Sequence, residues 1–299
     1  MWTGRPLIID TDPGTDDAIA LLVAAAEGLD VRLVVSTYGN VPHAHTKRNA
    51  VDLAGLLFPG TPVLYGADGP IEGRGHTAEY VHGANGVGGV RLRSFAPPDC
   101  EQGGTDALYR KIQALGRPDY IALGPLTNLA RLLAAYPQVE LGRVVVMGGG
   151  LHESNMDSGA EFNFACDPVA VRAVLDSGRV PQLVPLDATH QIQLSMEEVA
   201  AVSGPAAPAD TPRGQFAAIL RYNYDMSLRQ GDSGAIVHDA TAVLAYRYPE
   251  RFHAQSMRLA VDGQGRLSAL PGAPNAAFTT GVDRAFVLAR LKAAYARLS

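Results

Sequence analysis

The hydrophobic pattern alternates between short apolar runs and longer segments of helical period. The apolar runs are rich in valine, isoleucine and leucine and lack the polar alternation of a half-exposed strand. Such runs are typical of strands buried on both faces of a parallel sheet, and the helical segments between them predict crossovers that cover it. We expect strands at 6–10, 31–37, 61–66, 119–124, 142–149 and 181–187, with helices at 16–28, 45–58, 105–116, 126–136 and 167–178.

After Asp187 the pattern becomes mostly helical. Helices are expected at 195–204, 213–230, 237–248 and 284–298, a hairpin at 256–270 with DGQG as its turn, and a last strand at 276–282. No repeat or linker divides the chain, and its 299 residues are enough for one large core. We therefore predict a single α/β domain over 1–299. It has a mostly parallel central sheet flanked by helices, with a Rossmann-like core, and C-terminal helices and a small hairpin are added to it.

Composition and charge exclude several classes of protein. The net charge is −5 and no basic run is present, which argues against a nucleic-acid partner. No stretch is apolar for long enough to span a membrane, and MWTGRPLIID lacks the apolar core of a signal peptide. We expect a cytoplasmic protein in which Cys100 and Cys166 are free thiols.

Four carboxylates crowd the first predicted strand-to-helix junction, IIDTDPGTDDAIALL (8–22). Asp10 and Asp12 follow the strand, while Asp16 and Asp17 open the helix, whose dipole favours negative charge. The dipole cannot compensate four like charges, but a hard cation with oxygen ligands can. Calcium and magnesium both suit such ligands, and the lack of interleaved histidine or cysteine argues against zinc. Helix capping alone would explain Asp16 or Asp17 but not Asp10 and Asp12.

Polar residues follow other predicted strands as well. Asn40 follows the second strand, PLTN the one that ends at 124, Asn155 comes after MGGG, and ATH follows Asp187. In open parallel sheets, ligands bind in the crevice outside the carboxyl ends of the strands. The site is therefore expected at that edge. The segment 69–89 is glycine-rich and without period, which is typical of a functional loop or lid.

DTDPGTDD, STYGN, IALGPLTN, MGGG followed by AEFN, and VHDA occur in this order along the chain. Together they resemble the nucleoside hydrolases of the inosine–uridine preferring group, over about residues 5 to 245. The resemblance implies hydrolysis of the N-glycosidic bond of ribonucleosides to ribose and free base, in purine and pyrimidine salvage. It also implies a homodimer or homotetramer whose only other partner is a small-molecule ribonucleoside.

The resemblance implies roles for particular residues of this chain. Calcium is expected on Asp12, Asp17, Asp239 and the main-chain carbonyl of Leu123. Asp12 is also expected to be the base that activates water, and His238 the acid beside the leaving base. Asp10 would lie next to the ligands and support them without touching the ion. The expected substrate contacts are Asp16, Asn40, His82, Met147, Asn155, Glu161, Asn163 and Tyr222.

The chemistry of the reaction suits these residue types. Cleavage of an N-ribosidic bond passes through an oxocarbenium-like sugar. A metal can lower the pKa of a water, a carboxylate can take its proton, and amide or carboxylate oxygens can stabilise the positive sugar. Some residues also have simpler interpretations when taken alone. His238 and Asp239 could merely start a helix, AEFN could be a loop, Met147 and Tyr222 could pack in the core, and His82 could be an idle loop residue.

Two other functions remain open from the residues alone. One is a haloacid-dehalogenase-like phosphatase with Asp10 as nucleophile and magnesium as cofactor. It is disfavoured because we find no lysine in a suitable context, Pro13 interrupts the loop, and no Gly-Lys-Ser/Thr phosphate loop is present. The other is a non-catalytic, calcium-dependent nucleoside or ribose binding protein, which would need no base at Asp12.

Overall fold

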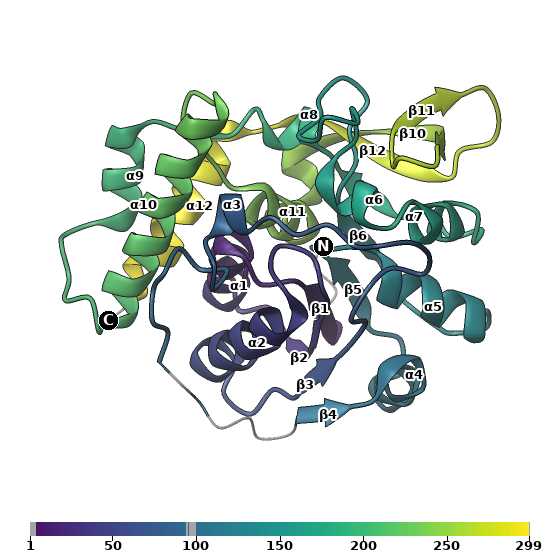
Figure 1. Cartoon of the computed structure of the whole chain (residues 1–299), viewed down its shortest axis with the longest axis horizontal. Coiled ribbons are helices and arrows are strands. Elements are labelled where there is room, and N and C mark those ends of the chain that lie inside the picture. The colour runs from purple at the N-terminus through teal and green to yellow at the C-terminus, as the bar shows by residue number, and fades with distance from the viewer. Residues whose placement is uncertain (1–3, 94, 96–99, 299) are drawn as a thin grey trace.

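The computed structural model describes residues 4–93, 95 and 100–298, and a ten-stranded sheet runs through this part of the chain (Figure 1). The strand order is β11-β10-β12-β7-β6-β5-β1-β2-β3-β4. All pairings from β12 to β4 are parallel, which confirms the predicted class. The parallel strands are β1 (Leu7–Thr11), β2 (Val31–Ser36), β3 (Val63–Tyr65), β4 (Cys100–Gln102), β5 (Asp119–Ala122), β6 (Val144–Met147), β7 (Gln182–Val184) and β12 (Ala276–Val282).

The predicted hairpin closes one edge of this sheet. β10 (Phe252–Val261) pairs antiparallel with β11 (Leu267–Leu270), and Val261 faces Leu267 across the turn. β10 begins at Phe252, earlier than predicted, because its first half pairs antiparallel with β12. The hairpin is therefore an extension of the main sheet.

Helices cover both faces of the sheet. Side chains alternate between the faces of β1: Leu7 and Ile9 join one apolar core, and Ile8 joins the other. The first core takes residues of α1, α2 and α8 to α12, and the second takes residues of α4, α5 and α7. The bounds are α1 (Thr15–Ala26), α2 (His43–Leu57), α4 (Gly104–Leu115), α5 (Thr127–Ala135), α7 (Pro168–Leu175), α9 (Met196–Ser203), α10 (Pro212–Gln230), α11 (His238–Arg247) and α12 (Arg284–Ala296).

Several short elements are absent from the sequence-based prediction. Each has only two to five residues, which is too short for a periodic pattern to be visible. The predicted strand 181–187 stops at Val184, since Pro185 leads directly into a short helix. No disulfide joins Cys100 and Cys166, and no helix in the described ranges has the length and hydropathy needed to cross a membrane. The short elements are α3 (Glu79–His82), α6 (Phe162–Cys166), α8 (Leu186–Thr189), β8 (Gln193–Leu194), β9 (Ala235–Ile236) and the 3-10 helix at Pro249–Arg251.

Candidate active site

A cavity of about 980 Å³ opens where the central strands end. Its wall includes Asn40 in the loop after β2, Leu123 directly after β5, and Met147, the last residue of β6. The segment 69–89, with the short helix α3, forms another part of the wall, and α10 and α11 contribute as well. The cavity therefore lies at the carboxyl edge of the sheet, where ligands bind in folds of this class.

Three carboxylates meet beside this cavity, and two of them, Asp16 and Asp239, line it. Oxygens of Asp16, Asp17 and Asp239 lie within 4.8 Å of one another, and all three side chains are buried. Asp16 and Asp17 are in the first turn of α1, while Asp239 comes from the first turn of α11. Asp17 is held by the Thr11 hydroxyl and by the backbone N–H of Gly14, at 2.9 Å. Tertiary packing thus brings Asp239 to the N-terminal acidic motif, as the resemblance implies.

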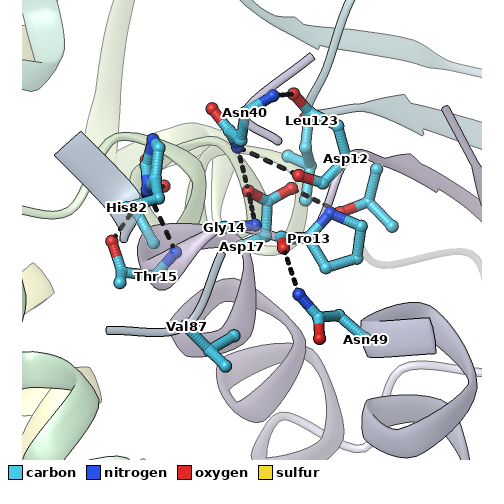
Figure 2. A network of polar contacts seen from close by, with 12 residues as sticks. Asp12, Pro13, Gly14, Thr15, Asp17, Asn40, Asn49, His82, Val87 and Leu123 are labelled. Atoms are coloured by element: carbon cyan, nitrogen blue, oxygen red, sulfur yellow. Dashed lines mark hydrogen bonds and ion pairs between the residues drawn. The ribbon is translucent and has the colours of Figure 1, made fainter. Parts of the chain in front are cut away.

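Asn40 connects Asp12 to Asp17 (Figure 2). Its backbone N–H donates to Asp12 Oδ2 and its side-chain amide to Asp17 Oδ2, both at 2.8 Å. The same amide donates to the main-chain carbonyl of Asp12 at 3.0 Å. The other carboxylate oxygen of Asp12, Oδ1, is buried without a hydrogen-bond partner in the described structure. A buried unpartnered carboxylate oxygen is costly, so this atom marks a position for a cation or a proton donor.

Burial and mutual repulsion make the cluster hard to ionise without a cation. Burial raises the pKa of Asp12, Asp16, Asp17 and Asp239, with Asp16 reaching about 8. Neighbouring carboxylates raise the pKa of Asp12, Asp16 and Asp239 further. The donors are all oxygens, which is the chemistry of a hard divalent cation. The cluster could therefore bind a metal ion, and it includes Asp16, for which the resemblance implies a sugar contact.

The Asp12 carboxylate lies against two glycines, at positions where any side chain would collide with it. A Cβ on Gly39 would lie 2.0 Å from Asp12 Oδ2, and one on Gly124 would lie 2.4 Å from Asp12 Oδ1. Gly39 also has a φ of +149°, whereas Gly124 has an ordinary backbone conformation. At Gly124 the need for glycine is thus set by side-chain contacts, first with the Asp12 carboxylate and then with Thr37 Cγ2 at 3.0 Å.

We expect Gly124→Ala to lower kcat by about 10- to 100-fold, because displacing a catalytic group by a fraction of an ångström has effects of that order. Overpacking should cost about 1–3 kcal/mol of stability, which leaves the protein folded. Steady-state rates and thermal melting measure the two effects. Gly69→Ala is the matched control, because a Cβ there meets nothing within 4 Å. Equal rates for both variants would contradict the close approach at Gly124.

The AEFN segment is the start of a helix. Glu161 is the N-cap of α6 and accepts from the backbone N–H groups of Asn163 and Phe164, at 2.8 and 3.1 Å. A third bond, 2.9 Å long, comes from the N–H of Gly149 after β6. Burial nevertheless raises the pKa of Glu161 to about 7. AEFN is therefore no plain loop: the cap turns Glu161 and Asn163 toward the cavity wall, which both residues line.

Asn163 and Asn155 complete this side of the site. The Asn163 amide donates to the main-chain carbonyls of Leu123 and Met147, at 2.7 and 3.3 Å. The Asn155 side-chain oxygen accepts from the N–H of Phe162 at 2.8 Å. Like Glu161, both asparagines line the cavity. The structure thus brings these predicted sugar contacts together with the carbonyl of Leu123.

The two predicted histidines both line the cavity and are fixed by threonines. His82 Nδ1 lies 3.2 Å from the backbone N and 3.0 Å from the hydroxyl of Thr15, so His82 is a buried, tethered residue (Figure 2). His238 Nδ1 lies 2.7 Å from the hydroxyl of Thr189. Burial lowers the pKa of His82 to about 4 and that of His238 to about 3. His190, which adjoins Thr189, lowers the pKa of His238 further.

Tyr222 and Asp10 lie outside the cavity lining. Tyr222 packs on Gly83 and Gly88 of the 69–89 loop, so the structure does not place it where it would stack on a base in the cavity. Other residues of α10 line the cavity instead: Asn223, Met226, Ser227 and Gln230. Asp10 accepts from the Tyr120 hydroxyl at 2.7 Å and the Asn128 amide at 3.0 Å, and burial raises its pKa to about 7.

The family of the chain can now be stated from comparison. The sequence model of the family described as "Inosine-uridine preferring nucleoside hydrolase" matches residues 7–289. The chain belongs to this family. As a nucleoside hydrolase it is an enzyme that cleaves the N-glycosidic bond of ribonucleosides, and the match favours neither the phosphatase nor the non-catalytic alternative.

Relatives and solved structures agree with this membership. The chain is 32% identical over 297 residues to the pyrimidine-specific ribonucleoside hydrolase RihA of Escherichia coli O8 (strain IAI1), covering 93% of this chain and 94% of RihA. A plant nucleoside hydrolase, PpNRh1, superposes with a TM-score of 0.88 at 27% identity, covering 98% and 99% of the two chains. The purine-preferring ribonucleoside hydrolase of Gardnerella vaginalis gives a TM-score of 0.86 at 25% identity, covering 97% and 98%.

Some residues that shape the site were missed by the sequence analysis. Thr11, Thr15 and Thr189 hold carboxylate or imidazole groups. Thr11 and Thr15 lie within DTDPGTDD, but no role was predicted for either threonine. Gly39 and Gly124 are required by a contact between segments that no local pattern reports. Thr189 and His190 belong to the tripeptide ATH (188–190), and its place after a predicted strand is the signal that the sequence gives for them.

Proposed function

We propose that this nucleoside hydrolase uses calcium and an Asp12 base to release free base and ribose from ribonucleosides. The observation that carries the proposal is the unpartnered, buried oxygen of Asp12 beside the cavity that Asp16 and Asp239 line. A calcium-dependent binding protein would use this oxygen as a metal ligand, but it would not need a carboxylate that takes a proton from water. A general base does, because it must accept a proton from water.

The residues that would hold calcium are Asp12, Asp17, Asp239 and the carbonyl of Leu123. The donors suit the ion, since calcium takes six to eight oxygen ligands in flexible geometry. Leu123 already accepts one hydrogen bond from Asn163, but a carbonyl oxygen has a second lone pair. Bound there, the ion would supply positive charge that grips the ribose diol and lowers the pKa of a neighbouring water.

The chain's own residues then perform the steps. Asp12 takes the proton of the attacking water as the water oxygen bonds to C1′ and the C1′–N bond breaks toward the base. Glu161 and the amides stabilise the positive sugar, and His238, oriented by Thr189, provides a proton for the leaving base. Asp10 stabilises the end of β1 through its hydrogen bonds with Tyr120 and Asn128. The residues that hold or line the substrate are Asp16, Asn40, His82, Met147, Asn155, Glu161 and Asn163.

The test is free-base release from inosine, adenosine, uridine and cytidine in the presence of calcium. Relatives named for pyrimidine and for purine substrates both exist, so the panel covers both classes. We expect release from at least one nucleoside and no turnover of p-nitrophenyl phosphate. Turnover of the phosphate alone would contradict the proposal. We further propose a homodimer or homotetramer acting in the cytoplasm, for which light scattering gives the oligomeric state.

A further inference from the structure

A second histidine faces the cavity beside His238. His190 directly follows α8 and lines the cavity, with its ring centroid 5.6 Å from that of His238 and the ring planes at 50°. Its Nδ1 lies 3.2 Å from Oε2 of Glu153. The His190 side chain is 20% exposed, and its Nδ1 faces a carboxylate, whereas the Nδ1 of His238 is bonded to Thr189. His190 therefore contacts a carboxylate and is open both to the cavity and to solvent.

The fold holds His190 and Glu153 together, because the segments that follow β6 and β7 are bonded to each other. The carboxylate of Asp187 in α8 accepts from the backbone N–H groups of Leu151 and His152, at 2.9 and 3.0 Å. The chain is tight at this turn, because a Cβ on Gly150 would lie 2.1 Å from the carbonyl oxygen of Glu153. The loop after β6 is thus clamped to the helix after β7, and Glu153 is brought to His190. The contact between His190 and Glu153 is too exposed to add much stability. That the fold nevertheless holds the two side chains together favours a role for them in the site.

We propose that His190, oriented by Glu153, supplies the one proton that the leaving base needs when His238 is neutral and does not supply it. The inference rests on the proposed function. Because Nδ1 faces Glu153, the proton leaves from Nε2. As the C1′–N bond breaks, its electron pair moves onto the base, this proton neutralises the base, and His190 regains a proton from solvent.

Other charged groups surround the pair and define its pH dependence. Asp232 also lines the cavity and is influenced by both His190 and Glu153, while His238 adjoins His190 on the other side. Glu153 and Asp232 place negative charge near His190, and His238 adds no positive charge while it is neutral. Loss of Glu153 should therefore make the acid harder to protonate. The alkaline limb of the rate profile should then move to lower pH.

The test compares two leaving groups. His190→Gln should lower kcat for inosine and uridine by about 10- to 100-fold with little change in KM, because it removes general-acid catalysis. The rate with p-nitrophenyl riboside, whose leaving group needs no proton, should change less than about threefold. Glu153→Gln should move the alkaline limb of kcat/KM for uridine to lower pH. His152→Gln is the matched control, an exposed histidine in the same loop, and should match the wild type.

Several outcomes would overturn the inference. They are equal losses on both leaving groups, a loss below about twofold on nucleosides, or an unchanged pH profile in Glu153→Gln. Thermal melting checks that each variant is folded, and His190→Asn provides a second variant if the glutamine form melts early. Failure of the proposed function is distinguishable, because the wild-type enzyme would then release no base from any nucleoside.

Discussion

Asp12→Asn is expected to lower kcat for nucleosides by about 10³-fold, or about 4 kcal/mol in the activation barrier. The substitution keeps the shape of the side chain, and its amide oxygen can still accept the N–H of Asn40, which now bonds to Oδ2 at 2.8 Å. It removes the basic oxygen that is buried without a partner, and it removes one negative charge from the proposed calcium site. Free-base release under saturating substrate and calcium measures the loss.

The matched control is Asp119→Asn. Asp119 is an equally buried aspartate at the first residue of β5, the end of that strand remote from the cavity, where it accepts from Tyr246 and the backbone of Arg143. This variant should melt at lower temperature yet keep its kcat. Wild-type rates in Asp12→Asn would remove Asp12 from the role of base. A loss confined to low calcium would reduce its role to that of a ligand.

Removal of calcium is expected to abolish activity and to lower the melting temperature. Without a cation the buried carboxylates raise one another's pKa, so an ion that binds only the folded state relieves repulsion. At a calcium concentration 100-fold above Kd, this adds about 2.7 kcal/mol of stability. In a chain of 299 residues that corresponds to roughly 4 °C in Tm. Melting and free-base release after chelation, followed by calcium titration, measure both effects.

Asp239→Asn separates this effect from general salt stabilisation. The variant loses one of the carboxylates that converge within 4.8 Å, so its Tm should respond weakly to calcium, while Asp119→Asn should respond like the wild type. Magnesium should stabilise less, because it demands a tighter octahedron and retains its waters. A chelated protein with full activity and unchanged Tm would contradict the calcium proposal.

The sequence by itself determined the layered fold and the place of the site. Short apolar runs without alternation are typical of strands buried on both faces, and the helices between them favour a parallel sheet. The carboxylates after β1 and Asn40 after β2 then lie at one edge, because the carboxyl ends of parallel strands meet there. These conclusions depend on the local spacing of apolar residues, which can be seen directly in the sequence.

Only the tertiary structure decided which side chains touch. Asp239 joins Asp16 and Asp17 across more than two-thirds of the chain, and Glu153 meets His190 through a clamp at Asp187. Tyr222, an equal candidate by position, packs on the loop instead of facing the cavity. Such contacts depend on how helices pack on the sheet to within about an ångström, and no periodic pattern along the chain carries that information.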